Sequence, residues 1–197
     1  MNTLAANVCY TPDDLLSMPD GDLYELIDGQ LVERHMGSWS SYVGGELFTL
    51  LKGFCQAHNL GWVWPADASY QCFEEAPNRV RKPDVSFIRF GRLPDERAPE
   101  GHTRIAPDLA VEVVSPKDLH YETERKVREY LRAGVRLIWV VIPESRIVLI
   151  YRADGSISGL REDGELNGED VVPGFRCRVG DLFQPPTPPP GNGERAV

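Results

Sequence analysis

Two apolar runs separated by an amphipathic one constrain the fold of this chain more than any other feature. The run DLAVEVVS, residues 108–115, is apolar almost throughout, which is typical of a central strand buried on both faces. Residues 119–133 instead repeat with the period of a helix, and Gly134 stands where a helix commonly ends. A second apolar run, RLIWVVIP, follows at 136–143. The order strand, helix, strand predicts an α/β fold with a mixed β-sheet.

Other segments add elements around this unit. Thr11 and Pro12 indicate the start of a short helix, and Asp28-Gly29 between two alternating runs predicts a β-hairpin. We expect a helix at 40–58, one or two strands within 61–73, and further strands at 82–88 and 146–153. Residues 155–166 are expected to form a small hairpin, with a last short segment at 171–183. The chain is predicted to be one domain over 1–183, followed by a disordered Pro/Gly-rich tail at 184–197.

Composition bears on the partners of the chain. The net charge is −9, with 30 acidic against 21 basic residues. This balance argues against a generic nucleic-acid binder, whose affinity comes largely from contacts of Lys and Arg to phosphate, but it does not exclude a nuclease. The four cysteines are scattered, and no segment has the pattern of a signal peptide or a membrane span. We therefore expect a cytoplasmic setting.

Three charged residues stand out against this pattern. Glu112 lies inside an apolar strand, where an uncompensated carboxylate costs several kcal/mol. Asp84 follows Pro83 at the start of another apolar strand, and Lys126 lies at the edge of the apolar face of the helix after Glu112. These three side chains are predicted to meet at one end of two adjacent strands. Alone, each has a simpler interpretation: a loop acid, a core acid paired with an arginine, and a lysine whose stem packs on the core.

Two carboxylates and a lysine suit the hydrolysis of a phosphodiester. Carboxylates are ligands that Mg²⁺ prefers, and the ion polarises a phosphoryl group and lowers the pKa of a bound water. A lysine can orient that water or neutralise charge that develops on the phosphoryl group. The combination predicts a metal-dependent nuclease.

Several motifs of this chain resemble those of the Uma-two family. They are YELIDGQLVE (24–33), KPD (82–84), DLAVEVVSP (108–116) and the helix with Lys126 that runs into YLRAGVRLIWVVIPE. That family is a branch of the PD-(D/E)XK nuclease superfamily, and the resemblance covers about residues 24–183. It implies a restriction-endonuclease-like core, a central mixed sheet flanked by helices with an N-terminal hairpin. It also implies a Mg²⁺-dependent DNA endonuclease, in which Mn²⁺ can substitute, and a homodimer.

The resemblance assigns roles to single residues. Asp84 and Glu112 correspond to the two acids of the motif, and the backbone carbonyl of Val113 is the further metal ligand that it implies. The usual superfamily lysine falls at position 114, which is Val114 here, and Lys126 matches its migrated position. These assignments predict the catalytic set Asp84, Glu112 and Lys126.

Some assignments stay open. Many family members carry a histidine near Ser40 or Ser41, and its absence here raises the prospect of weak or altered activity. Glu46 and Glu25 are possible additional site acids, or else a solvated helix acid and a hairpin-face residue. The alternatives to a nuclease are a catalytically inactive nucleic-acid-binding or regulatory module of the same fold and a buried ion-pair network.

Overall fold

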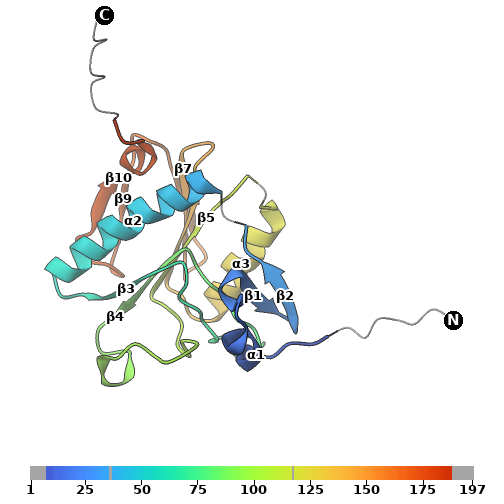
Figure 1. Cartoon of the computed structure of the whole chain (residues 1–197). Helices are drawn as coiled ribbons and strands as arrows, with labels where there is room; N and C mark the ends of the chain where they lie inside the picture. The colour runs from blue at the N-terminus through green and yellow to red at the C-terminus, as the bar shows by residue number, and fades with distance from the viewer. Residues whose placement is uncertain (1–7, 36, 117, 188–197) are drawn as a thin grey trace, which may run out of the picture.

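A six-stranded mixed sheet forms the centre of the computed structural model, which describes residues 8–35, 37–116 and 118–187 (Figure 1). Only β5 and β6 run parallel, and every other neighbouring pair is antiparallel. This arrangement confirms the predicted mixed sheet. In their order across the sheet the strands are β3 (Gly61–Pro65), β4 (Val85–Arg89), β5 (Leu109–Val113), β6 (Leu137–Ile142), β7 (Ile147–Arg152) and β8 (Ile157–Leu160).

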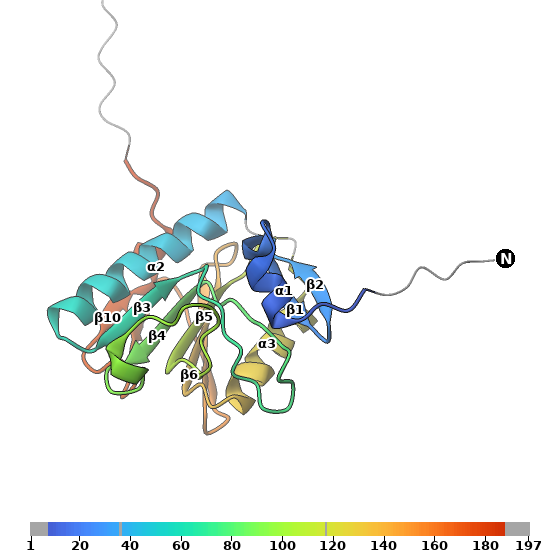
Figure 2. The same cartoon turned by 60° about the horizontal axis from the view of Figure 1, so that its bottom comes forward.

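Two helices cover opposite faces of this sheet, α2 (Ser38–Ala57) and α3 (His120–Arg132) (Figures 1 and 2). The alternation of β5 sends Leu109, Val111 and Val113 into the core under α2. Ala110 faces the core under α3, and Glu112 shares its side of the strand. The strand is apolar on both faces because both faces are covered, and Glu112 is the acid directed toward α3.

The N-terminal hairpin lies against the α3 side of the molecule (Figure 2). Strands β1 (Tyr24–Ile27) and β2 (Gln30–Glu33) join through Asp28 and Gly29, whose φ angles of 50° and 78° both lie in the left-handed region. Two backbone hydrogen bonds between Leu26 and Val80 tie β1 to the segment that leads into β4. Helix α1 (Pro12–Ser17), with Thr11 as its cap, and the turn η1 (Gly21–Leu23) precede the hairpin.

The C-terminal part corrects one expectation. Residues 155–166 do not form a hairpin of their own, because β8 pairs with β7 whereas β9 (Glu165–Asn167) pairs with β10 (Arg176–Arg178). The turn that separates β8 from β9 therefore does not pair them, since β8 pairs with the strand before it and β9 with a strand after it. The turns η2 (Pro94–Glu96) and η3 (Val179–Phe183) complete the elements, and residues 188–197 of the predicted tail lie outside the described residues. None of the described helices has the length and apolar character that crossing a membrane requires.

Candidate active site

Asp84 lies directly before β4 and links this strand to its neighbour β5. Its backbone N–H donates to the carbonyl of Val111 at 2.9 Å, so the residue is held against β5. Its side chain reaches one step further, and Oδ2 accepts the backbone N–H of Val113 at 2.7 Å. This second contact fixes one carboxylate oxygen beside the residue that follows Glu112 in the sequence.

Glu112 is buried, and α3 supplies the groups that compensate it. Lys126 Nζ lies 2.9 Å from Glu112 Oε2, and the Tyr130 hydroxyl donates to Oε1 at 2.8 Å. Lys126 and Tyr130 are four residues apart and therefore share one face of the helix. The carboxylate thus has both a cation and a neutral donor, which is what a buried charge requires.

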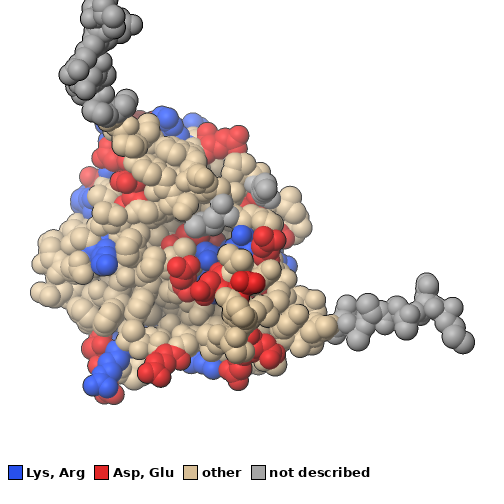
Figure 3. All heavy atoms as spheres, viewed as in Figure 1, with Lys and Arg blue, Asp and Glu red and all other residues tan. Residues whose placement is uncertain are grey.

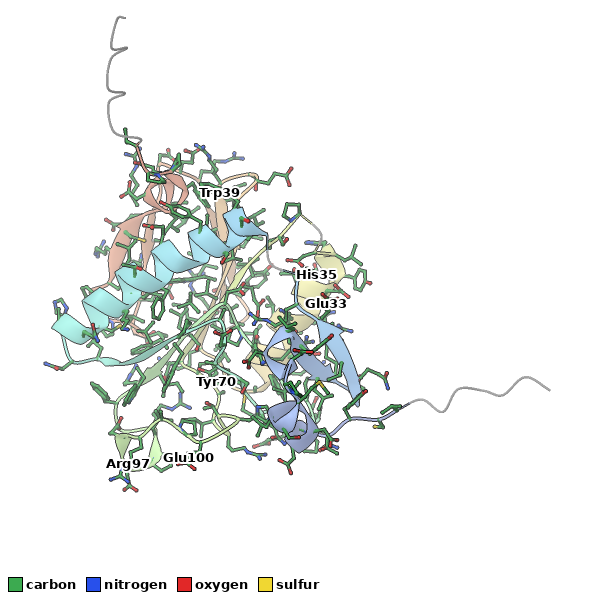
Figure 4. The ribbon with its side chains drawn as sticks, viewed as in Figure 1. Glu33, His35, Trp39, Tyr70, Arg97 and Glu100 are labelled. Atoms are coloured by element: carbon green, nitrogen blue, oxygen red, sulfur yellow. The ribbon has the colours of Figure 1, made fainter. Side chains whose placement is uncertain are left out.

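A small cleft open to solvent lies where the hairpin, the end of β5 and the start of α3 meet, with a cavity volume of about 70 Å³. Figure 3 shows acidic and basic side chains gathered side by side on this part of the surface, and Figure 4 places Glu33 and His35 at the end of the hairpin beside it. The cleft is lined by Glu25, Val32, Glu33, Arg34, His35, Arg81, Asp84, Glu112, Val113, Val114, Asp118, Glu122, Thr123, Arg125 and Lys126. Six of these residues are acidic and four are Lys or Arg, so the cleft favours cations.

The hairpin contributes two charged residues to this cleft. Glu25 on β1 lies 3.5 Å from Lys126 Nζ, which places the lysine between two carboxylates. Arg34, directly after β2, brings Nη2 to 3.3 Å from Asp84 Oδ1. Each of the two predicted metal-binding acids is therefore paired with a base.

Behind Glu25 lies a buried network centred on Arg81. Its Nη1 donates to Glu25 Oε2 at 2.8 Å and its Nε to Glu129 Oε2 at 2.7 Å. The backbone N–H of Lys82 donates to the other oxygen of Glu25 at 2.8 Å. Arg81 is only 1% exposed, so these pairs are shielded from water and the hairpin, the β4 approach and α3 are held together by charge.

These surroundings shift the pKa of Asp84 upward. Burial raises it most, the charge of Glu112 raises it further, and Lys126, the Val113 N–H and Arg34 act in the opposite direction. The resulting pKa is about 7. Two carboxylates that repel one another in a buried site are the environment in which a divalent cation is most strongly favoured.

The ammonium of Lys126 and the carboxylate of Glu25 are stabilised instead. Burial opposes the charge of Lys126, but Glu112, Glu25 and Asp84 outweigh it and raise the pKa of the lysine. Burial likewise opposes the charge of Glu25, but Lys126, Arg81 and the Lys82 N–H lower its pKa to about 2. Lys126 is therefore held as a cation, which suits charge stabilisation better than proton abstraction.

The donor set fits a hard divalent cation that keeps several waters. Asp84 and Glu112 offer carboxylate oxygens. The carbonyl of Val111 accepts the backbone N–H of Asp84, and the carbonyl of Val113, two residues later, points to the same edge of β5. Among the described residues no group of three or more His, Cys, Asp or Glu side chains is arranged to hold a metal. A site with the two carboxylates of Asp84 and Glu112 fits Mg²⁺, which commonly binds one or two carboxylates and completes its coordination shell with water.

Two other predicted positions lie differently. Glu46 is on α2 beside Tyr42, and burial together with the charge of Glu46 raises the pKa of Tyr42. Glu46 is not among the residues that line the cleft. Ser40 and Ser41, where the resemblance leads us to expect a histidine, line a neighbouring hollow that also exposes Asp84. The hydroxyl of Ser40 donates to the carbonyl of Val114 at 3.2 Å, so this residue anchors α2 to the end of β5.

Sequence reasoning missed three residues of the site. Tyr130 lies on the apolar face of the helix that carries Lys126, and its hydrogen bond to Glu112 depends on how that helix crosses the sheet. Arg81 stands three residues before Asp84, and its proximity to KPD was the available signal. Arg34 gave no signal, because its contact with Asp84 joins residues 50 positions apart.

A model of the Uma2 family, described as "Putative restriction endonuclease", matches residues 12–180 of this chain. Among solved structures, the chain is similar to "a putative nuclease belonging to DUF820" from Anabaena variabilis. The two share 20% sequence identity with a TM-score of 0.73 over 88% of this chain and 97% of that one, a likeness of fold. Comparison with curated proteins gives no match.

Proposed function

Because the chain belongs to the Uma2 family of restriction-endonuclease-like proteins, we propose that it is a Mg²⁺-dependent nuclease that hydrolyses phosphodiester bonds of DNA. One observation carries the proposal. Asp84 and Glu112 present two buried carboxylates linked through the backbone of Val113, with the Lys126 ammonium 2.9 Å from the second. Both acids line the cleft.

Asp84, Glu112 and the carbonyl of Val113 would hold the Mg²⁺. The ion supplies positive charge that polarises the phosphoryl group and makes water more acidic, and Mn²⁺ is expected to replace it. Glu112 is kept in a single orientation by Tyr130, and Asp84 by the Val113 N–H. Both carboxylates are therefore preorganised, which is a condition for an efficient site.

Lys126 contributes a fixed positive charge close to the two acids. Its Nζ lies between Glu112 and Glu25, so the ammonium cannot turn away without losing a partner. In this position it stabilises the negative charge that develops on a phosphoryl group during attack by water. The lysine lies on a helix instead of two positions after Glu112, but only the position of the ammonium matters for this role.

A second candidate function is a nucleic-acid-binding or regulatory module that does not cut. The observation in its favour is that Arg34 and Lys126 already compensate the two acids. A pair of salt bridges of this kind needs no metal, and buried salt bridges are by themselves weak evidence of any role.

Calorimetric titration with Mn²⁺ separates these two functions. The nuclease proposal expects binding to the wild type and a loss of binding in Asp84→Asn and Glu112→Gln. Glu46→Gln is the matched control, since it removes an acid outside the cleft and should leave Mn²⁺ binding intact. A wild type that binds no Mn²⁺, with or without DNA, would establish the non-cutting module instead.

Cleavage assays then address the substrate. Plasmid DNA, single-stranded DNA and RNA are incubated with Mg²⁺ or Mn²⁺, and the proposal expects DNA to be cut in a manner abolished by EDTA.

We also propose that the protein acts in the cytoplasm and as a two-fold dimer, because cutting both strands of a duplex requires two sites. Sedimentation equilibrium at micromolar concentration tests the dimer, and a monomeric mass would refute it.

A further inference from the structure

Arg34 occupies the side of Asp84 that a metal ion would need. One oxygen of Asp84 is taken by the Val113 N–H, and the other lies 3.3 Å from Nη2 of Arg34. The arginine side chain is only 11% exposed, and its backbone N–H donates to the carbonyl of Leu23 at 2.9 Å. The guanidinium is thus brought to the acid by the hairpin and is well shielded from water there.

A cation bound between Asp84 and Glu112 would compete with the guanidinium of Arg34 for the carboxylate of Asp84. Like charges at such short separations repel one another strongly in a partly buried site. Arg34 therefore lowers the affinity of Asp84 for any metal as long as the pair persists. Its other natural partner is phosphate, to which the planar guanidinium donates two parallel hydrogen bonds.

The cleft makes this exchange of partners specific to a bound phosphate. Acids outnumber bases among its lining residues, and in the absence of a ligand the Arg34 guanidinium pairs with the carboxylate of Asp84. A phosphodiester entering the cleft brings the one group that competes with Asp84 for the guanidinium. Arg34 stands on the cleft wall and can reach such a group without leaving the hairpin end.

We propose that Arg34 exchanges partners: it pairs with Asp84 in the free protein and with the phosphate of a bound nucleic acid, leaving Asp84 free for the metal. This inference rests on the proposed function and adds a positioning and coupling role for one residue. By linkage, nucleic acid and metal then strengthen each other's binding by the same factor. The consequence is a nuclease site that takes up its metal most readily when substrate is present.

The test is Mn²⁺ calorimetry on the full chain, with and without a short phosphorothioate duplex as the nuclease-resistant probe. The duplex is also titrated alone, so that its own Mn²⁺ binding is subtracted. In the wild type we expect the duplex to tighten Mn²⁺ binding by about tenfold, a typical coupling between two sites. In Arg34→Gln we expect the free protein to bind Mn²⁺ about tenfold tighter and the duplex to add several-fold less.

Two further variants make the result decisive. Arg128→Gln removes an exposed arginine of α3 that pairs with Glu124, so it controls for the loss of one positive charge and should match the wild type. Arg34→Lys keeps the charge but not the paired donors, and it is measured if Arg34→Gln fails to fold. With lysine, we expect Mn²⁺ affinity close to wild type and a weaker effect of the duplex.

The outcomes distinguish this inference from the proposed function. If Arg34→Gln is folded and binds Mn²⁺ no more tightly than the wild type, Arg34 is a fixed structural partner and the exchange is wrong. The nuclease proposal would survive that result as long as Asp84→Asn abolishes Mn²⁺ binding. A wild type that binds no Mn²⁺ at all would overturn both.

Discussion

Glu25 lies at the point where the cleft and the buried ion network meet. Its two oxygens contact Arg81, Lys126 and the backbone of Lys82, and the side chain is almost fully buried. The charge of this residue therefore stabilises the fold and positions Lys126 at the same time. A single residue with both duties links the stability of the protein to the geometry of its site.

This position makes a prediction about pH. The pKa of Glu25 is about 2 in the folded protein against an ordinary value of 4.5, so its charge stabilises the fold fully above pH 4.5. That contribution is lost as the pH falls from 4.5 toward 2, because the unfolded chain then binds the proton more readily. Glu25→Gln should be about 3 kcal/mol less stable than wild type at pH 7. The difference should shrink below pH 4.5.

Urea unfolding of both proteins between pH 3 and pH 7 measures this difference. Comparing the two proteins at each pH removes the contribution of the other acids, which titrate in both. A difference that stays constant down to pH 3 would contradict the low pKa of Glu25.

Lys126 has a prediction of its own. Lys126→Met should reduce the cleavage rate by about 100-fold or more, as the loss of a charge-stabilising group typically does. Mn²⁺ affinity should stay or increase, because Glu112 loses a competing cation. Single-turnover cleavage and calorimetry check the two halves, with Arg128→Met on the exposed side of α3 as the control. Loss of Mn²⁺ binding in Lys126→Met would count against this assignment.

At the scale of elements, the hairpin β1–β2 is the part of the fold that most directly serves the site. It carries Glu25 on one strand and Arg34 directly after the other, and a bridge between Leu26 and Val80 fixes it beside β4. Its turn depends on Gly29, whose φ of 78° is strained for any residue with a Cβ. A disturbance at the turn is expected to reach the cleft through both strands.

Gly29→Ala and Gly155→Ala test this coupling. Both glycines have φ near 80°, and Gly155 lies in the turn between β7 and β8, away from the cleft. The left-handed backbone alone should cost each variant about 1 kcal/mol of stability, and Gly29→Ala should cost more, because its Cβ would meet the Cys9 side chain whereas the space at position 155 is open. Only Gly29→Ala should also weaken Mn²⁺ binding and cleavage. Equal effects of the two variants on Mn²⁺ binding would show that the hairpin turn does not control the site.

The elements also show what sequence can predict and what it cannot. Local patterns placed α3, β5 and the Asp28-Gly29 hairpin, because helical period, strand burial and turn residues are encoded within a few positions. Helical geometry also directed Lys126 toward Glu112. The same reasoning failed at residues 155–166, where β8 pairs with the preceding strand β7 and β9 with the later strand β10, and it could not supply Arg34, whose partner lies across the fold. Pairing between distant segments is decided by packing of the whole chain.

For the whole molecule, the net charge of −9 sets the conditions for binding nucleic acid. An acidic protein with an acidic cleft repels phosphates unless a divalent cation is present. We expect no binding to a DNA duplex in EDTA and clear binding in Ca²⁺, a hard divalent cation that also takes oxygen ligands. Fluorescence anisotropy measures both conditions, and Asp84→Asn should remove the effect of Ca²⁺. Tight binding in EDTA would contradict the dependence on metal.

The charged groups of the cleft come from five stretches of chain: the hairpin with the residues directly after it, the approach to β4, the end of β5, the loop that follows β5 and helix α3. A nascent polypeptide emerging from the ribosome carries Asp84 and Glu112 before Lys126 and Tyr130 have been translated. It must then dock α3 on the sheet before the carboxylate of Glu112 gains its cation. For a protein proposed to cut DNA, synthesis itself would delay the hazard, since an incomplete chain has no means of damaging the chromosome of its own cell.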